Sequence, residues 1–137
     1  MQLHASCVAF DGKGILIRGA SGSGKSTLAL ALLAIGADLV ADDRTDIAVR
    51  EGWPVASPPA ALEGLIEVRG LGLLRADAKA PARLVVVIDL DQTETARLPE
   101  PKTITLGGQS LPLLHKIESA HFAAALRQYV LCGKANL

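Results

Sequence analysis

An eight-residue glycine-rich stretch constrains this chain more than any other feature of its sequence. Residues 19–26 read Gly-Ala-Ser-Gly-Ser-Gly-Lys-Ser and match the pattern G-x-x-x-x-G-K-[ST]. An apolar run at 15–18 precedes the stretch, and a run of strong helix formers at 26–35 follows it and ends before Gly36. A loop of this kind between a strand and a helix turns backbone N–H groups toward a phosphate, beside the positive end of the helix. We therefore expect an α/β fold with a phosphate-binding loop.

The last residues of the loop have separate expected roles. Lys25 reaches the β- and γ-phosphates of a nucleotide and offsets the charge of the transferring group, while Ser26 binds Mg²⁺ through its hydroxyl. The alternative is a glycine-rich turn that only caps a helix. The residues that we expect to hold ATP are Gly19, Ala20, Ser21, Gly22, Ser23, Gly24, Lys25, Ser26 and Thr27.

Composition limits the other classes of function. The 137 residues are 50% hydrophobic and 20% charged, which fits one domain over 1–137. Fourteen basic and fourteen acidic residues cancel, so there is no electrostatic reason to expect nucleic acid or an anionic membrane as partner. The apolar runs at 28–35 and 84–88 are far shorter than the roughly 20 residues of a membrane span. The N-terminus does not resemble a signal peptide, so we expect a cytoplasmic protein in which Cys7 and Cys132 are reduced, small apolar residues.

Turn residues and apolar runs give the order of the elements. A strand at 3–10 and the run at 15–18 flank Asp11-Gly12, the turn signal of a hairpin. The stretch at 55–65 reads as a loop that can begin a short helix. The other expected elements are strands at 38–41 and 45–50, a central strand at 84–88, two short strands within 104–114 and a helix at 118–131.

A phosphate-binding loop needs a carboxylate near its magnesium, and two places compete for this role. Asp89 ends the continuous aliphatic run at 84–88, as the second acidic strand of P-loop proteins usually does. Asp42 and Asp43 end a shorter run, and adjacent carboxylates that face different ways can divide the work between the metal and a substrate proton. These residues alone leave both possibilities open.

Four stretches of the chain resemble, in order and spacing, the catalytic domain of HPr kinase/phosphorylase. They are His4, the loop at 19–26, Leu39–Asp43 and the stretch at 67–72, Glu-Val-Arg-Gly-Leu-Gly. The last stretch is the specific one, because P-loops occur in many unrelated enzymes. The resemblance implies a P-loop kinase with a mixed β-sheet, similar to phosphoenolpyruvate carboxykinase. It also implies transfer of the γ-phosphoryl group of ATP, with Mg²⁺, to a serine of an HPr-type phosphocarrier of the phosphotransferase system.

The resemblance implies roles for the residues that handle the proton. Asp43 matches the family acid that accepts the proton of the target serine and returns it in the reverse reaction, with Asp42 as its support. His4 matches an active-site histidine that assists the phosphate and this carboxylate. Under this interpretation Asp89 is a structural residue.

The resemblance implies further roles in metal binding and charge stabilisation. Glu67 matches the second magnesium ligand beside Ser26, and Arg69 lies in the stretch linked to both reaction directions. Arg97 matches a later active-site arginine. Members of the family are commonly hexamers, which implies a homo-oligomer.

The chain also departs from the family pattern. Where longer relatives carry P-V-R-P-G-R, linked to phosphorolysis of phosphoserine, residues 112–117 read Pro-Leu-Leu-His-Lys-Ile and contain no arginine. The reverse reaction and the usual docking of the protein substrate therefore stay open. Two alternatives also stay open: a small-metabolite or nucleotide kinase that uses Asp89, and a non-catalytic module that senses ATP.

Overall fold

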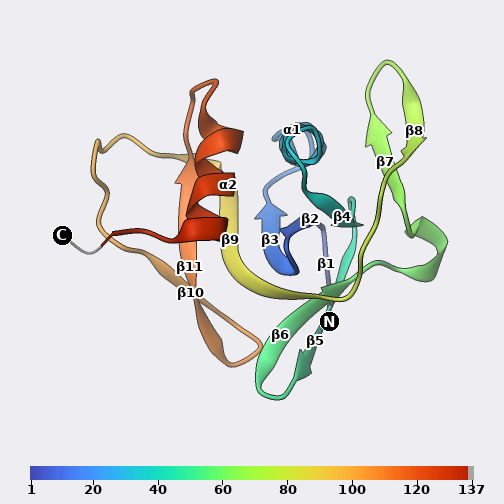
Figure 1. The fold of residues 1–137 in the computed structure, drawn as a ribbon, viewed down its shortest axis with the longest axis horizontal. Helices are drawn as coiled ribbons and strands as arrows, with labels where there is room; N and C mark the ends of the chain where they lie inside the picture. The colour runs from blue at the N-terminus through green and yellow to red at the C-terminus, as the bar shows by residue number, and fades with distance from the viewer. Residues whose placement is uncertain (136–137) are drawn as a thin grey trace.

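The computed structural model describes residues 1–135 (Figure 1). Within that range the chain forms eleven strands, two α-helices and one 3-10 turn. No helix in this part of the chain is both long and apolar enough to cross a membrane. In chain order the elements are β1 Gln2–Leu3, β2 Ala5–Phe10, β3 Lys13–Arg18, α1 Lys25–Leu33, β4 Asp38–Ala41, β5 Thr45–Arg50, β6 Trp53–Ser57, η1 Ala60–Leu62, β7 Leu65–Val68, β8 Gly72–Arg75, β9 Ala82–Thr93, β10 Thr103–Leu106, β11 Gln109–Lys116 and α2 Phe122–Cys132.

The main sheet is mixed, as predicted. Its strand order is β1-β5-β6-β9-β3-β2-β4, and β11 also pairs with β9. The pairs β3–β9 and β9–β11 are parallel, and the other pairs of this sheet are antiparallel. Figure 1 shows the long β9 curving through the molecule, the two helices above the sheet, and the β7–β8 hairpin projecting to one side. The carboxyl ends of β3, β9 and β11 therefore meet at the edge that the helices cover.

The core has two layers, because the central strands are buried on both faces. On β3, Ile15 and Ile17 pack with side chains of α1 and α2, whereas Leu16 joins a second cluster with side chains such as Val40 and Ala56. This double burial explains why the central strands are almost continuously aliphatic instead of alternating. Each fully buried aliphatic side chain contributes about 1.5–3 kcal/mol to folding.

The predicted hairpin about Asp11-Gly12, the helix after the glycine-rich loop and the central strand at 84–88 are confirmed. The prediction of a loop from residue 55 is wrong, because β6 occupies Trp53–Ser57 and pairs with both β5 and β9. A hydrogen bond from the Trp53 indole N–H to the carbonyl of Leu84, 2.7 Å long, adds to this pairing. The C-terminal helix begins at Phe122, after a turn around Ser119, and not at 118.

Candidate active site

The loop between β3 and α1 has a backbone that requires glycine. Gly22 and Gly24 adopt φ values of 81° and 102°, a region that other residues rarely occupy. A Cβ atom on Gly19 would lie 2.4 Å from the Oγ of Ser23, so a larger residue there would force Ser23 to move. The Ser23 N–H donates to the carbonyl of Ala20 at 3.0 Å and closes the curl. The sequence therefore builds a tight concave loop at the start of α1.

The N-terminal end of α1 is open to an anion. No side chain caps it, and its first turn carries no acidic residue. The N–H groups of a first helical turn have no partners within the helix, and the helix dipole makes this end positive. In residues 1–135 the Oγ of Ser23 is buried and has no hydrogen-bond partner. These polar groups together fit a phosphate chain lying along the loop.

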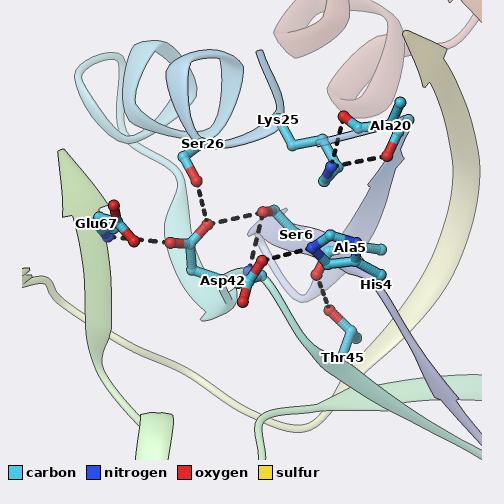
Figure 2. A network of polar contacts seen from close by, with 11 residues as sticks. His4, Ala5, Ser6, Ala20, Lys25, Ser26, Asp42, Thr45 and Glu67 are labelled. Carbon is cyan, nitrogen blue, oxygen red and sulfur yellow. Dashed lines mark hydrogen bonds and ion pairs between the residues drawn. The ribbon is translucent and has the colours of Figure 1, made fainter. Parts of the chain in front are cut away.

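Lys25 carries a buried positive charge. The residue is 7% exposed, and its Nζ donates to the carbonyls of Gly19 at 2.7 Å and Ala20 at 3.0 Å (Figure 2). None of the ion pairs in the described part of the chain includes Lys25. Because a buried charge without a counter-ion is costly, this ammonium favours a bound anion.

Asp42 lies at the centre of the polar network in Figure 2. The residue is 5% exposed, and one oxygen of its carboxylate accepts hydrogen bonds from the hydroxyls of Ser26 at 2.8 Å and Ser6 at 2.7 Å. The other oxygen accepts the N–H of Glu67 at 3.0 Å. One carboxylate therefore connects the first turn of α1 with β2, β4 and β7.

The side chain of Asp43 has a different partner from that of Asp42. Its Oδ1 forms a hydrogen bond with Nε2 of His4 at 2.7 Å, and both side chains are about half exposed. The backbone of Asp43 has a φ of 67°, and its N–H donates to Oγ of Ser6 at 3.3 Å. Asp tolerates this left-handed conformation better than most residues. The tight turn thus directs one acid into the protein and the next toward solvent.

The residues from these separate elements line one cavity of about 570 Å³. This volume lies within the range of small-molecule sites. Its walls include most of the predicted site: His4, Ser21, Gly22, Gly24, Lys25, Ser26, Thr27, Asp43, Glu67 and Arg69. The structure therefore combines an anion-binding loop, a buried lysine and an exposed His–Asp pair in one place.

Comparison with known proteins identifies the family. Residues 1–96 match the family model of the HPr serine kinase C-terminal domain. The chain belongs to this family. Over 73 residues it is 49% identical to the HPr kinase/phosphorylase of Clostridium tetani (strain Massachusetts / E88). It is 42% identical, over the same length, to that of Lactococcus lactis subsp. lactis (strain IL1403). Each alignment covers 53% of this chain and 24% of the relative, so the matched part is about a quarter of those proteins.

A solved structure confirms the predicted fold of this HPr kinase-family domain. The Hpr(Ser) kinase/phosphatase from Coxiella burnetii superposes with a TM-score of 0.78. The match covers 94% of this chain and 90% of that chain, at 21% sequence identity. The mixed α/β architecture is thus shared.

Asp89, the competing acid, does not line the cavity. Its carboxylate pairs with Arg18 at 3.3 Å and accepts the N–H of Asp91 at 2.9 Å. The carboxylate of Asp91 in turn accepts the N–H of Ala20 with both oxygens, at 3.0 and 3.1 Å. Asp89 is thus linked, through Asp91, to the start of the loop at 19–26.

Arg97 is not brought to the site either. It lies in the exposed segment between β9 and β10 and does not line the cavity. In Figure 1 this segment and the β7–β8 hairpin lie on opposite sides of the molecule. The structure of residues 1–135 therefore does not place Arg97 with the other predicted site residues.

Sequence reasoning missed the part played by Ser6 and assigned Asp42 only a supporting role. Ser6 is an isolated hydroxyl in an apolar strand and carries no signal of its own. The signal is in the pairing: β2 and β4 are antiparallel, with Cys7 opposite Ala41, so the preceding Ser6 lies beside the following Asp42. Knowledge of that register is needed to find the pair.

The oxygen atoms around Ser26 suit a magnesium ion. The Ser26 hydroxyl contacts the carboxylate of Asp42. Ser26 and Glu67 both line the cavity of about 570 Å³. Hard oxygen ligands of this kind are those that Mg²⁺ prefers. Residues 1–135 contain no cluster of three His, Cys, Asp or Glu side chains arranged to hold a metal, so a bound ion would also use oxygens of the phosphates.

Proposed function

We propose that this domain is a protein-serine kinase that transfers the γ-phosphoryl group of ATP, with Mg²⁺, to a serine of an HPr-type phosphocarrier protein. Family membership and the names of the relatives support the substrate class. The observation that carries the proposal is one cavity that combines the buried Lys25, which has no counter-ion within residues 1–135, with the His4–Asp43 pair.

The proposed phosphoryl transfer needs a general base, positive charge beside the transferring phosphoryl group, and alignment of the attacking serine with that group. The serine Oγ attacks the γ-phosphorus, the bond between this phosphorus and the β–γ bridging oxygen breaks, and ADP leaves. The serine proton passes to the carboxylate of Asp43, which is exposed to an incoming protein and held by His4 at 2.7 Å. Lys25 and Arg69 offset the charge on the transferring oxygens.

Magnesium fits the other half of the site. We propose Ser26 and Glu67 as its ligands, with Asp42 next to them, held on the Ser26 hydroxyl at 2.8 Å. Bound by these residues, the ion would neutralise part of the charge of the phosphate groups. Without Mg²⁺ in the reaction mixture, we expect phosphoryl transfer to stop.

The alternative kinase, in which Asp89 serves the metal, has less support. Asp42 rather than Asp89 contacts the hydroxyl of Ser26, and the carboxylate of Asp89 is occupied by Arg18 and by the Asp91 N–H. The ATP-sensing alternative keeps the loop but has no use for the His4–Asp43 pair, which faces solvent beside the loop.

We also propose a single catalytic domain over 1–137, a cytoplasmic location and a homo-oligomer, hexameric by resemblance to the family. The absence of a membrane-crossing helix in residues 1–135 is compatible with this location. Size-exclusion chromatography with light scattering tests the oligomer, and a mass near that of one chain would overturn it.

The function is tested by incubating the domain with γ-labelled ATP, Mg²⁺ and a purified HPr-type phosphocarrier. We expect label on a serine, located by mass spectrometry. Lys25→Ala should lower the rate by at least about 100-fold, whereas Lys13→Ala, at an exposed lysine of the β2–β3 hairpin, should not.

ATP binding without labelled serine would support the sensor, and label only on small hydroxyl compounds would support the metabolite kinase. Release of labelled pyrophosphate from the product, on addition of inorganic phosphate, would add the reverse reaction.

A further inference from the structure

A second cavity, of about 460 Å³, lies on the other flank of α1. Its walls are mainly apolar and come from three separate elements and one segment that follows β11. The apolar side chains are Leu28 and Ala31 of α1, Leu90 of β9, Ile117 after β11, and Phe122 and Ala123 of α2. The cavity opens at the carboxyl ends of the parallel strands β9 and β11, where open α/β sheets usually bind ligands.

The two cavities meet at the start of α1. Gly24 and Thr27 line both of them. The cavity of about 570 Å³ that Lys25 lines, the phosphate cavity, extends from these residues toward Asp43 and Glu67, on the β4 and β7 side. The cavity of about 460 Å³, the apolar cavity, extends toward β9 and β11. In the sheet order, β4 and β9 lie on opposite sides of β3, the strand that leads into the loop.

This arrangement fixes the direction of a bound nucleotide. The γ-phosphate must face Asp43, because that carboxylate takes the proton of the attacking hydroxyl. The α-phosphate then lies at the other end of the loop, near Ser23 and Thr27. The group attached to the α-phosphate is thereby directed toward the apolar cavity.

The chemistry of this cavity suits a nucleoside. A nucleobase has two apolar faces and polar edges, and the cavity pairs apolar walls with a polar rim that includes Lys116, Glu118 and Ser119. The Oγ of Ser23, which lines the same cavity, is buried without a hydrogen-bond partner in the described chain. An unpaired buried hydroxyl next to an apolar wall favours a ligand that carries both kinds of surface.

We propose that the cavity between α1, the ends of β9 and β11, and the start of α2 binds the nucleoside half of the phosphate donor. This inference rests on the proposed function, since it takes ATP as the donor. The protein substrate is a less suitable occupant, because the acceptor serine must approach Asp43 on the opposite flank of α1.

The test compares two ligands that share a triphosphate and differ in the nucleoside. Isothermal titration calorimetry with Mg²⁺ measures the binding of ATP and of inorganic tripolyphosphate. We expect the wild-type domain to bind ATP about tenfold or more tightly than tripolyphosphate, since only ATP buries surface in the apolar cavity.

Two variants narrow this cavity from opposite walls. Ala120→Trp adds a ring at an exposed position that lines the cavity, and Ala31→Phe adds one from α1. Each should weaken ATP binding about tenfold and leave tripolyphosphate binding within about twofold. Ala124→Trp, at an exposed position of α2 outside the cavity, is the matched control and should change neither. Thermal melting confirms that each variant is folded.

The outcomes separate this inference from the proposed function. Binding of neither ligand to the wild type would overturn the proposed donor and this inference with it. Equal affinity for both ligands, or ATP binding that both cavity variants leave unchanged, would overturn the inference alone. A raised KM for the phosphocarrier with unchanged ATP affinity in Ala120→Trp would assign the cavity to the protein substrate instead.

Discussion

A single buried hydroxyl, that of Ser6, organises both acids of the site. The residue is 0% exposed, its Oγ donates to Asp42 at 2.7 Å, and the same oxygen accepts the N–H of Asp43 at 3.3 Å. Ser6 therefore positions a carboxylate next to Ser26 and the turn that presents the next carboxylate to solvent, without lining the cavity itself.

Ser6→Ala should lower kcat for phosphoryl transfer by about tenfold or more, since both acids lose a fixed partner. The KM for ATP should change little, because the loop and Lys25 are untouched. The loss of these two hydrogen bonds should cost about 1–3 kcal/mol of folding free energy. Steady-state kinetics and urea unfolding measure these values.

Cys7→Ala is the matched control for this substitution. Cys7 is the next residue of β2, belongs to the second core cluster and is also fully buried. Its truncation should reduce stability and leave kcat unchanged. If Ser6→Ala behaves in the same way, Ser6 has only a structural role.

The two cysteines differ in solvent exposure, although the sequence analysis treated both as small apolar residues. Burial raises the pKa of the Cys7 thiol far above its usual range, whereas Cys132 is exposed at the end of α2. A raised pKa means that little reactive thiolate forms at pH 8. Iodoacetamide should therefore alkylate Cys132 in the native protein and reach Cys7 only after unfolding. Peptide mass spectrometry reads the sites, and equal labelling of both native thiols would contradict the burial of Cys7.

At the scale of elements, the loop before α1 depends on close contact rather than on flexibility. Gly19→Ala would place a Cβ 2.4 Å from Oγ and 3.1 Å from Cβ of Ser23, and 3.2 Å from Cβ of Leu90, so Ser23 and the loop around it must adjust. We expect ATP affinity to fall about tenfold or more, because the N–H groups that hold the phosphates lose their alignment. Calorimetric titration with ATP measures the loss.

Gly36→Ala is the control for the loop variant. Gly36 has a φ of 105° and open space around its Cβ position, at the far end of α1. Its substitution should cost about 1 kcal/mol of stability and leave ATP affinity intact. An equal loss of affinity in both variants would show that general destabilisation, and not the loop contact, causes the effect.

Elements with a local signal were predictable, and elements that depend on distant partners were not. The Asp11-Gly12 turn and the helix formers at 26–35 determine the hairpin and α1 from their own sequence. β6 was missed because Trp53-Pro54 and the prolines after it look like a loop, while its partners β5 and β9 decide its conformation. The β7–β8 hairpin was not among the expected elements.

At the scale of the whole molecule, the sheet order places the proton-handling residues and the apolar cavity on opposite flanks of one helix. β4 and β7 present the acids, β9 and β11 border the second cavity, and the loop after β3 lies between them. A triphosphate nucleotide can therefore extend across the first turn of α1. This arrangement depends on strand pairs such as Leu16 with Val87, which are far apart in sequence.

The tertiary structure also shows which parts of the site could be predicted from the sequence. The loop and the resemblance singled out His4, Lys25 and Asp43, and the structure places all three in the lining of one cavity. The choice between Asp42 and Asp89 could not be made from motifs alone. Asp42 follows β4 and Asp89 lies within the last residues of β9, and the two strands run toward the same edge of the sheet. Only the tertiary contacts, Ser26 to Asp42 and Arg18 to Asp89, distinguish them.

The most direct measurement is the rate of labelled phosphoryl transfer to an HPr-type phosphocarrier, at saturating ATP and Mg²⁺, by Asp43→Asn and Asp89→Asn. We expect Asp43→Asn to lower kcat by at least about 100-fold, because the amide cannot accept the serine proton. Asp89→Asn should stay within about threefold of the wild type, since the Asn oxygen can still accept the Asp91 N–H and only the partly exposed ion pair with Arg18 is weakened. The reverse pattern, with Asp43→Asn active and Asp89→Asn inactive in a folded protein, would contradict the account.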